Sequence, residues 1–250
     1  MKQFLAAGLL LALPVLAQGP PGGGRGGRGG PPPTPKASAS IDMTGTWVSV
    51  VTEDWKFRMV TPPKGEFGGV PVSAAGRTAA MAWDPDKDTA AGNACKSYGA
   101  AGIMRVPGRL KISWDDDRTM KIETEAGTQT RLFHFGGAAP ANTESSWQGY
   151  ATAQWEQAVV DPGQPRMGDL RVTTSHMKAG YLRKNGVPYS ENASLTEYYD
   201  RHTAPNGDVW LVVTTEVLDP QYLTEHFVTS THFKKIPDNS PWRPEPCSAK

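Results

Sequence analysis

The chain has 250 residues and a formal net charge of +1, and 38% of its residues are hydrophobic. Four basic residues and no acidic residue precede Ile41, so the rest of the chain carries a formal charge of −3. This length suits one domain with a sizeable core, and the slight acidity argues against nucleic acid or an anionic membrane as a partner.

Residues 1–17 have the organisation of a secretory signal peptide. A basic start at Lys2 precedes the apolar run from Phe4 to Leu16, with small residues before a cleavage point after Ala17. The run is shorter than the roughly 20 apolar residues of a transmembrane helix, so no transmembrane segment is expected. We expect export to the periplasm or the extracellular space.

Residues 18–40 are rich in glycine and proline and contain no large apolar side chain. Such a stretch cannot bury enough surface to offset its ordering entropy, so it predicts a disordered tether before a domain at 41–250. Two RGG triplets are typical of RNA-binding tails, but a spacer is the favoured interpretation.

The start of the domain combines strands with one clear helix. Residues 48–51 indicate a first strand, and residues 52–60 alternate apolar and basic side chains as a second strand would. Ser73 is placed as the N-cap of an alanine-rich helix that ends at Asp84-Pro85. The small apolar stretch 98–107 would plug one end of a barrel or pack under a loop.

Residues 109–135 predict a β-meander of three strands. Leu110 and Ile112 alternate with polar residues, as do Met120 and Ile122, and either Leu132 or Phe133 and Phe135 continue the pattern. Turns are expected at 115–118 and at 125–127, where Gly127 is free to take a positive φ.

The stretch Ser146 to Glu156 alternates again, with small residues between Trp147 and Trp155 on one face. This pattern indicates a bulky group crossing that face, either a neighbouring side chain or a ligand. Another strand is expected at 169–177. Residues 179–192 predict either an irregular binding loop or a plain crossover with an Asn185-Gly186 turn.

Three more strands are expected at 194–203, 208–218 and 224–236, with tight turns at Asn206-Gly207 and Asp219-Pro220. No alternation of strands with helices occurs, which excludes a parallel sheet. We therefore expect an all-β fold: a single antiparallel up-and-down β-barrel of about 9–10 strands with one short helix.

Two cysteines, Cys95 and Cys247, are the only ones in the chain. An even pair in an oxidising compartment predicts a disulfide, which would attach the C-terminal tail to the region after the helix. A thiol nucleophile or a metal ligand is the alternative, but neither has a partner nearby in sequence.

The motif TGTW at 44–47 resembles the Gly-x-Trp opening of lipocalin-type (calycin) barrels. In that superfamily the tryptophan closes the barrel bottom beneath a basic side chain from the last strand. The resemblance implies this role for Trp47, with Lys234 and Lys235 as the candidate basic residues. The expected helix follows the second strand rather than preceding the C-terminus, so the resemblance implies the barrel architecture alone.

A second resemblance covers most of the mature domain. A family of exported, uncharacterised proteins of environmental Gram-negative bacteria is similar in the stretches CKSYGAAGIMRVP, QTRLFHFGG, WQGYATAQWE, LTEYYDRHT and DPQYLTEHFVTSTHFKK. It implies export and carries no activity.

The chain has none of the common catalytic or metal-binding motifs: HExxH, CxxC, a phosphate-binding glycine loop and GxSxG are all missing. His226 and His232 are six residues apart, about 20 Å along a strand, so they cannot share a metal ion without a bend. We expect neither a metal nor a cofactor.

Glu197 and Arg131 are the charged residues that alternation places beside apolar neighbours. Glu197 shares a face with Leu195 and Tyr199, which favours an ion pair with Arg131 or Arg201 or, alternatively, a carboxylate with a raised pKa that acts as an acid or base. Arg131 would stack on aromatic rings or bind a ligand carboxylate, and only Arg131 or His134 can point inward.

The leading hypothesis is a monomeric binding protein for a small, mostly apolar or aromatic molecule in the barrel mouth. Arg131 and Glu197 would orient polar groups, and the aromatic lining would consist of Trp147, Tyr150, Trp155, Tyr181, Tyr198 and Trp210. One alternative is an isomerase, lyase or hydratase that pairs His134, His176 or His232 with Glu197. The other is a periplasmic protein whose surface docks a partner.

Overall fold

The structure is a computed structural model that describes residues 31–157 and 168–250. The predicted signal peptide and the predicted tether up to residue 30 lie outside the described residues. Residues 33–250 form one unit, to which all that follows refers. Among the described residues, no helix has the length and apolar character needed to cross a bilayer.

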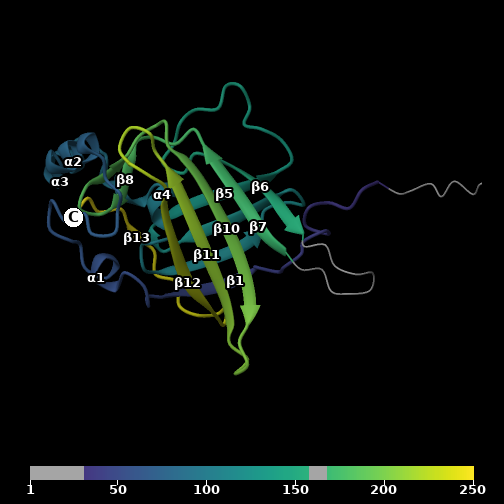
Figure 1. Cartoon of the computed structure of the whole chain (residues 1–250). Helices are drawn as coiled ribbons and strands as arrows, with labels where there is room; N and C mark the ends of the chain where they lie inside the picture. The colour runs from purple at the N-terminus through teal and green to yellow at the C-terminus, as the bar shows by residue number, and fades with distance from the viewer. Residues whose placement is uncertain (1–30, 158–167) are drawn as a thin grey trace, which may run out of the picture. The chain divides into compact units, whose positions relative to one another are not determined.

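Nine strands close into a barrel (Figure 1), which confirms the predicted all-β class and barrel architecture. In chain order the strands are β1 (Gly45–Val50), β2 (Arg109–Trp114), β3 (Thr119–Thr124), β5 (Gln129–Phe135), β6 (Tyr150–Gln157), β7 (Gly168–Ser175), β10 (Ser194–Thr203), β11 (Val209–Leu218) and β12 (Phe227–Ile236). Around the barrel the order is β1-β12-β11-β10-β7-β6-β5-β3-β2, and β1 pairs with β2 to close it.

The expectation of antiparallel order throughout is wrong at one place. Strand β6 runs parallel to β5, with Phe133 opposite Ala151 and Phe135 opposite Ala153. The connection at 136–149 returns the chain to the end from which β5 started, so the next strand points the same way. Alternation along a strand does not indicate its direction relative to a neighbour, so the sequence could not predict that β5 and β6 run parallel.

The two meanders form as predicted. Strands β2, β3 and β5 pair antiparallel in sequence order, as do β10, β11 and β12. Phe133 and Phe135 are buried while Leu132 is 38% exposed, which decides the register that the sequence left open. Gly127 has φ +71°, and a Cβ there would lie 2.4 Å from the Tyr98 ring, so only glycine fits.

The small residues between Trp147 and Trp155 make room for neighbouring side chains. Ala151 and Ala153 are buried in the core cluster that includes Phe133 and Phe135 of the adjacent strand. The bulky group that crosses this face is thus part of the protein, one of the two alternatives that the pattern allowed.

Short elements cover one end of the barrel, where Figure 1 shows helices α1, α2 and α3 together. These elements are α1 (Trp55–Arg58), α2 (Ala74–Met81), α3 (Pro85–Ala90), the 3₁₀ helix η1 (Ala94–Tyr98), α4 (Ala100–Ile103), β4 (Ala126–Gly127), β8 (Gly180–Arg183), β9 (Val187–Tyr189) and β13 (Glu245–Pro246). We call them the cap.

The predicted second strand at 52–60 is wrong, because this stretch contains helix α1. Strand β1 already pairs with β12 on one side and with β2 on the other, so no edge remains for another neighbour. Asp54 takes a left-handed conformation with φ 50° and turns the chain away from the barrel. Arg58 becomes buried, whereas Trp55 and Met59 become exposed.

Helix α4 plugs this end of the barrel, as one reading of the small apolar stretch predicted. Ile103 and Met104 belong to the core cluster inside the barrel, while Ala100 and Ala101 belong to a second cluster that packs cap residues against barrel residues such as Leu195. The second cluster also receives Tyr189 from the segment 179–192. That segment is a hairpin of β8 and β9 with buried side chains rather than an irregular loop.

Trp47 and Lys235, one of the two lysines that the calycin resemblance offers for it, lie together. Trp47 is fully buried and donates its indole N–H to the Met43 carbonyl oxygen at 2.9 Å. The Lys235 ammonium lies 5.6 Å from the centroid of its ring, and the two residues are paired across β1 and β12.

The predicted disulfide between Cys95 and Cys247 is present. It joins η1 to the C-terminal tail, where β13 pairs parallel with β4. The described end of the predicted tether also contacts the barrel: the Pro35 carbonyl accepts a hydrogen bond from the Trp155 indole at 2.9 Å. The Lys36 N–H donates to the Asp117 carbonyl at 3.2 Å.

The predicted N-cap of α2 gives a first testable effect. The Ser73 hydroxyl accepts the Gly76 N–H at 3.1 Å and donates to the Gln221 carbonyl at 3.1 Å. We expect Ser73→Ala to lower the free energy of unfolding by about 1 kcal/mol in urea denaturation. Ser73→Thr, which keeps a hydroxyl for both bonds, is expected to lose less; equal losses would contradict the capping role.

Candidate functional site

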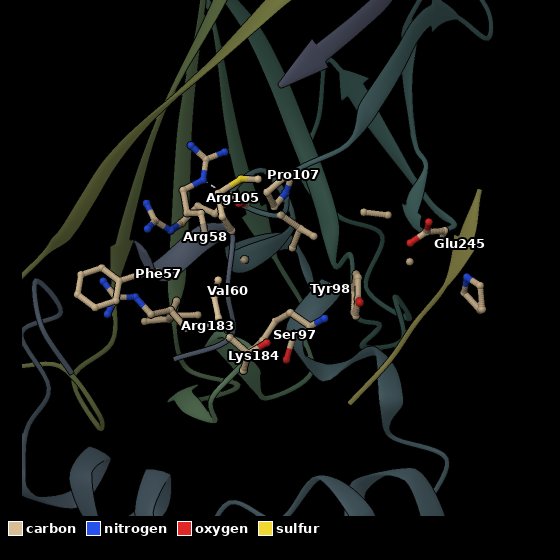
Figure 2. Close-up of a pocket in the computed structure, with 18 residues that line it drawn as sticks. Phe57, Arg58, Val60, Ser97, Tyr98, Arg105, Pro107, Arg183, Lys184 and Glu245 are labelled. Carbon is tan, nitrogen blue, oxygen red and sulfur yellow. Dashed lines mark hydrogen bonds between the residues drawn. The ribbon is translucent and has the colours of Figure 1, made fainter. Parts of the chain in front are cut away.

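A pocket of about 290 Å³ lies among the elements of the cap and the segments next to them. Its walls come from α1 and the residues after it, from η1 and α4, from β8 and from the β4–β13 pair (Figure 2). The apolar part of the lining includes Phe57, Met59, Val60, Tyr98, Val106, Pro107 and Leu182. The charged part consists of Arg58, Arg105, Arg183, Lys184 and Glu245. We call this site the arginine pocket.

The three arginines come from three separate elements. Arg58 is the last residue of α1, Arg105 follows α4, and Arg183 ends β8. They are 8%, 5% and 4% exposed, respectively. Figure 2 shows them at one end of the pocket near Phe57, with Tyr98 and Glu245 farther along. The cap therefore collects three buried guanidinium groups that are distant in sequence.

Arg58 and Arg105 are only partly neutralised. Arg58 forms an ion pair with Glu53 and donates Nε–H to the Arg105 carbonyl at 2.9 Å. Arg105 donates from Nη2 to Asp54 at 2.9 Å. One terminal nitrogen of each, Nη2 of Arg58 and Nη1 of Arg105, is buried without a hydrogen-bond partner among the described residues.

Arg183 has less support. All three of its guanidinium nitrogens are buried and lack a hydrogen-bond partner among the described residues. Its closest compensation is the face of the Phe57 ring, whose centroid lies 4.3 Å from the guanidinium carbon. A buried cation without a hydrogen-bonding anion is costly, so this group is a strong attractor for one.

Burial and neighbouring positive charge lower the pKa values of two arginines of the pocket. Burial, and then the positive charge of Arg105, lower the pKa of Arg58 to about 10. The same two causes lower the pKa of Arg183 to about 10, although Asp54 and Glu66 act in the opposite direction. Both groups remain protonated at neutral pH, and each would gain from a negative charge in the pocket.

The arrangement suits binding of an anion. A guanidinium with all its donors available matches the two oxygens of a carboxylate or a phosphate. The apolar side chains beside it match a hydrocarbon part of the same molecule. Among the lining residues there is no histidine and a single carboxylate, Glu245, so the pocket offers binding groups rather than an acid–base pair.

The two charged residues that the sequence singled out, Arg131 and Glu197, lie inside the barrel instead. Arg131 donates to Glu197 through both terminal nitrogens, at 2.8 Å and 2.6 Å, and the Tyr199 hydroxyl donates to the same carboxylate at 3.2 Å. Burial opposes the charge on Arg131, yet Glu197 outweighs it and raises the pKa of Arg131. The pair satisfies itself, which agrees with the ion-pair interpretation.

The predicted aromatic lining does not come together as one wall. The residues concerned are spread over the barrel exterior, the cap and the barrel interior: Trp147, Tyr150, Trp155, Tyr181, Tyr198 and Trp210. Tyr198 and Trp210 alternate with the buried residues Tyr199 and Leu211 and so lie on the outer face. They cannot share a cavity with Arg131.

Three of the remaining aromatic residues have partners of their own. Tyr150 stacks on His134 with centroids 4.6 Å apart, and Tyr181 donates its hydroxyl to Asp88 at 2.7 Å. Trp155 packs on Phe135 with centroids 5.5 Å apart. Trp147 lines a shallow outer groove together with His134.

No histidine of the proposed acid–base pair meets Glu197. His134 alternates with the buried Arg131 and Phe133 on β5, so it faces outward, and His176 is exposed. His232 lies on the outer face of β12, where its Nδ1 is 3.3 Å from Glu53. Glu197 is enclosed by Arg131 and Tyr199 within the barrel.

The residues of the arginine pocket were missed from the sequence because each was assigned to another context. Arg58 was placed on the polar face of a strand, and Arg105 and Arg183 lay in a plug and a loop. One signal was present: each arginine directly follows an apolar residue, and Arg105 lies in a largely apolar stretch, as in Met104-Arg105-Val106. An arginine inside a segment that must be buried is costly without a partner.

The chain matches no protein-family model, no curated protein and no solved structure. The resemblance to exported proteins of environmental bacteria therefore stays a prediction. The closed barrel is compatible with the calycin-like architecture, which is all that the TGTW resemblance implied. Within residues 31–157 and 168–250, no group of three or more His, Cys, Asp or Glu side chains is arranged to hold a metal ion.

Proposed function

We propose that the protein binds a small amphiphilic anion in the arginine pocket. Binding of a small, partly apolar molecule is retained from the sequence, but the site is a different one, because the arginine pocket contains none of the ligand-binding residues that the sequence predicted. The negative charge of the ligand is also new. The observation that carries the proposal is the guanidinium of Arg183, which is buried and has no hydrogen-bond partner among the described residues.

The chemistry of the walls defines the ligand further. Its carboxylate or phosphate would contact Arg183 and the free nitrogens of Arg58 and Arg105, and its hydrocarbon part would lie against Phe57, Val106 and Leu182. A volume of about 290 Å³ is at the lower end of small-molecule pockets, which favours a medium-length chain or a single ring over a long acyl chain.

The acid–base alternative has no support in the arrangement of the side chains, because Glu197 is paired with Arg131 and the candidate histidines lie outside the barrel.

The test is calorimetric titration with decanoate and, as the uncharged match, decanol. We expect the protein to bind decanoate and to bind decanol much more weakly. Arg183→Gln should weaken decanoate binding by roughly 10- to 100-fold, since hydrogen bonds to charged groups contribute about 1.5–3 kcal/mol each. Arg118→Gln, an exposed arginine outside the pocket, is the matched control.

The Arg183→Gln protein should also remain folded. The substitution removes a buried charge that lacks a hydrogen-bond partner, so the free energy of unfolding should stay equal or rise. Decanoate binding that is absent in the wild type, or equal in Arg183→Gln and the wild type, would refute the proposal.

A further inference from the structure

Exposed apolar side chains cluster at the rim of the arginine pocket. Trp55, Met59 and Val60 are 64%, 60% and 66% exposed. They are three of the seven large hydrophobic side chains that are exposed among the described residues, and all three lie within one stretch of six residues. Met59 and Val60 also line the pocket, so the exposed patch and the cationic site are continuous.

Basic side chains flank this patch. Lys56 in α1 and Lys64 after it are exposed, and Lys184 lines the pocket. Asp54 is close by, but it is engaged in the ion pair with Arg105. A tryptophan with aliphatic neighbours between lysines is the composition of segments that lie in the interface of an anionic bilayer.

We propose that the rim, residues 55–60, docks on an anionic phospholipid bilayer, with a lipid phosphate held in the arginine pocket. The inference rests on the proposed function, and it identifies the anion that binds in the arginine pocket as the phosphate of a membrane lipid. Trp55, Met59 and Val60 enter the interfacial region, while Lys56 and Lys64 lie at the level of the headgroups.

A lipid accounts for both halves of this surface at once. Its phosphate supplies the hydrogen-bonding anion that Arg183 lacks, and the acyl chains of the bilayer cover the exposed rim. The pocket has room for a headgroup, and the chains stay in the membrane. The domain as a whole is slightly acidic, but attraction to a bilayer decays within about 10 Å, so the local cations decide it.

The test is co-sedimentation of the protein with vesicles of phosphatidylglycerol and phosphatidylcholine, compared with vesicles of phosphatidylcholine alone. We expect binding to the anionic vesicles only. The rim variant Trp55→Ala/Lys56→Gln should bind them at least about tenfold more weakly. The control Val228→Ala/Lys87→Gln removes an equally exposed apolar residue and an exposed lysine elsewhere and should bind as the wild type does.

Decanoate titration of the rim variant separates this inference from the proposed function, because neither Trp55 nor Lys56 lines the pocket. The expected result is lost vesicle binding with decanoate binding retained. Decanoate binding without any vesicle binding overturns the membrane inference. Equal vesicle binding by the rim variant and the control overturns the assignment of the rim as the docking surface. If the wild type does not bind decanoate, the proposed function itself is refuted. If Arg183→Gln binds vesicles as the wild type does, the lipid phosphate does not bind in the arginine pocket.

Discussion

Replacing Glu197 by glutamine is expected to lower the free energy of unfolding by about 3–5 kcal/mol, because it leaves Arg131 charged and uncompensated within the barrel. Both side chains are essentially inaccessible, at 1% and 0% exposure. Arg131 donates two hydrogen bonds to the carboxylate and contacts Thr174 and Tyr199 only at 3.4 Å. Glutamine has one acceptor oxygen where the carboxylate has two, and it carries no negative charge.

Guanidinium denaturation of purified protein measures this loss, with Glu216→Gln as the control. Glu216 is the same residue type on the neighbouring strand β11, and its ion pair with His226 is partly exposed. Surface pairs contribute about 0–1 kcal/mol, so the control should be nearly neutral. Similar losses for the two variants would mean that the buried pair is not a special feature of the core.

A second substitution tests whether the loss comes from the uncompensated charge or from altered packing. Arg131→Met in the Glu197→Gln background removes the uncompensated cation and leaves neutral side chains of similar length. We expect this double variant to be more stable than Glu197→Gln alone, because neutral replacement of a buried ion pair costs less than breaking it. An additive loss would show instead that both residues matter through packing.

Removal of the Cys95–Cys247 disulfide is the other large expected effect. The two cysteines are 152 residues apart, and the chain-entropy relation for a loop of this length gives about 5 kcal/mol. Measured effects are commonly smaller, so we expect Cys95→Ser/Cys247→Ser to lose about 2–5 kcal/mol. The comparison is thermal unfolding of the oxidised wild type, the reduced wild type and the serine variant.

The disulfide should also affect the arginine pocket. Strand β13, which supplies Glu245 and Pro246 to the lining, lies just before Cys247 and pairs with β4 through two residue pairs only. Glu245 also donates its N–H to the Glu125 carbonyl and accepts from the Thr128 hydroxyl. Without the covalent link these bonds alone position the strand, so decanoate should bind more weakly to the serine variant. Equal decanoate affinity in the serine variant and the wild type would show that the disulfide does not shape the pocket.

Much of the barrel follows from local patterns. Strands β10, β11 and β12 and the meander of β2, β3 and β5 follow from alternation, because one face of each strand must be apolar. The N-cap at Ser73 and the turn at Gly127 follow from residue chemistry that acts within a few positions. The Cys95–Cys247 bridge follows from there being only one possible pair.

The same patterns misled where a neighbour, rather than the segment itself, decides the outcome. Alternating residues at 52–60 could form a strand, but the closed barrel leaves no edge for it, so it becomes α1. The expectation from net charge, that an anionic membrane is not a partner, stays a prediction; a charge averaged over a whole domain does not describe one cluster of arginines. Alternation placed Arg131 and Glu197 beside apolar residues without showing that they meet.

By itself, then, the sequence determined which residues of most strands share a face, where α2 begins, and which two cysteines bond, because these depend on interactions along the chain or on a unique choice. Which face points into the barrel was decided by the closed sheet, as the burial of Phe133 and the exposure of Leu132 show. Only the tertiary structure decided that β5 and β6 run parallel and that Arg131 neutralises Glu197. It alone brings Arg58, Arg105 and Arg183 to one pocket. Each of these depends on contacts between segments far apart in sequence, which no local periodicity records.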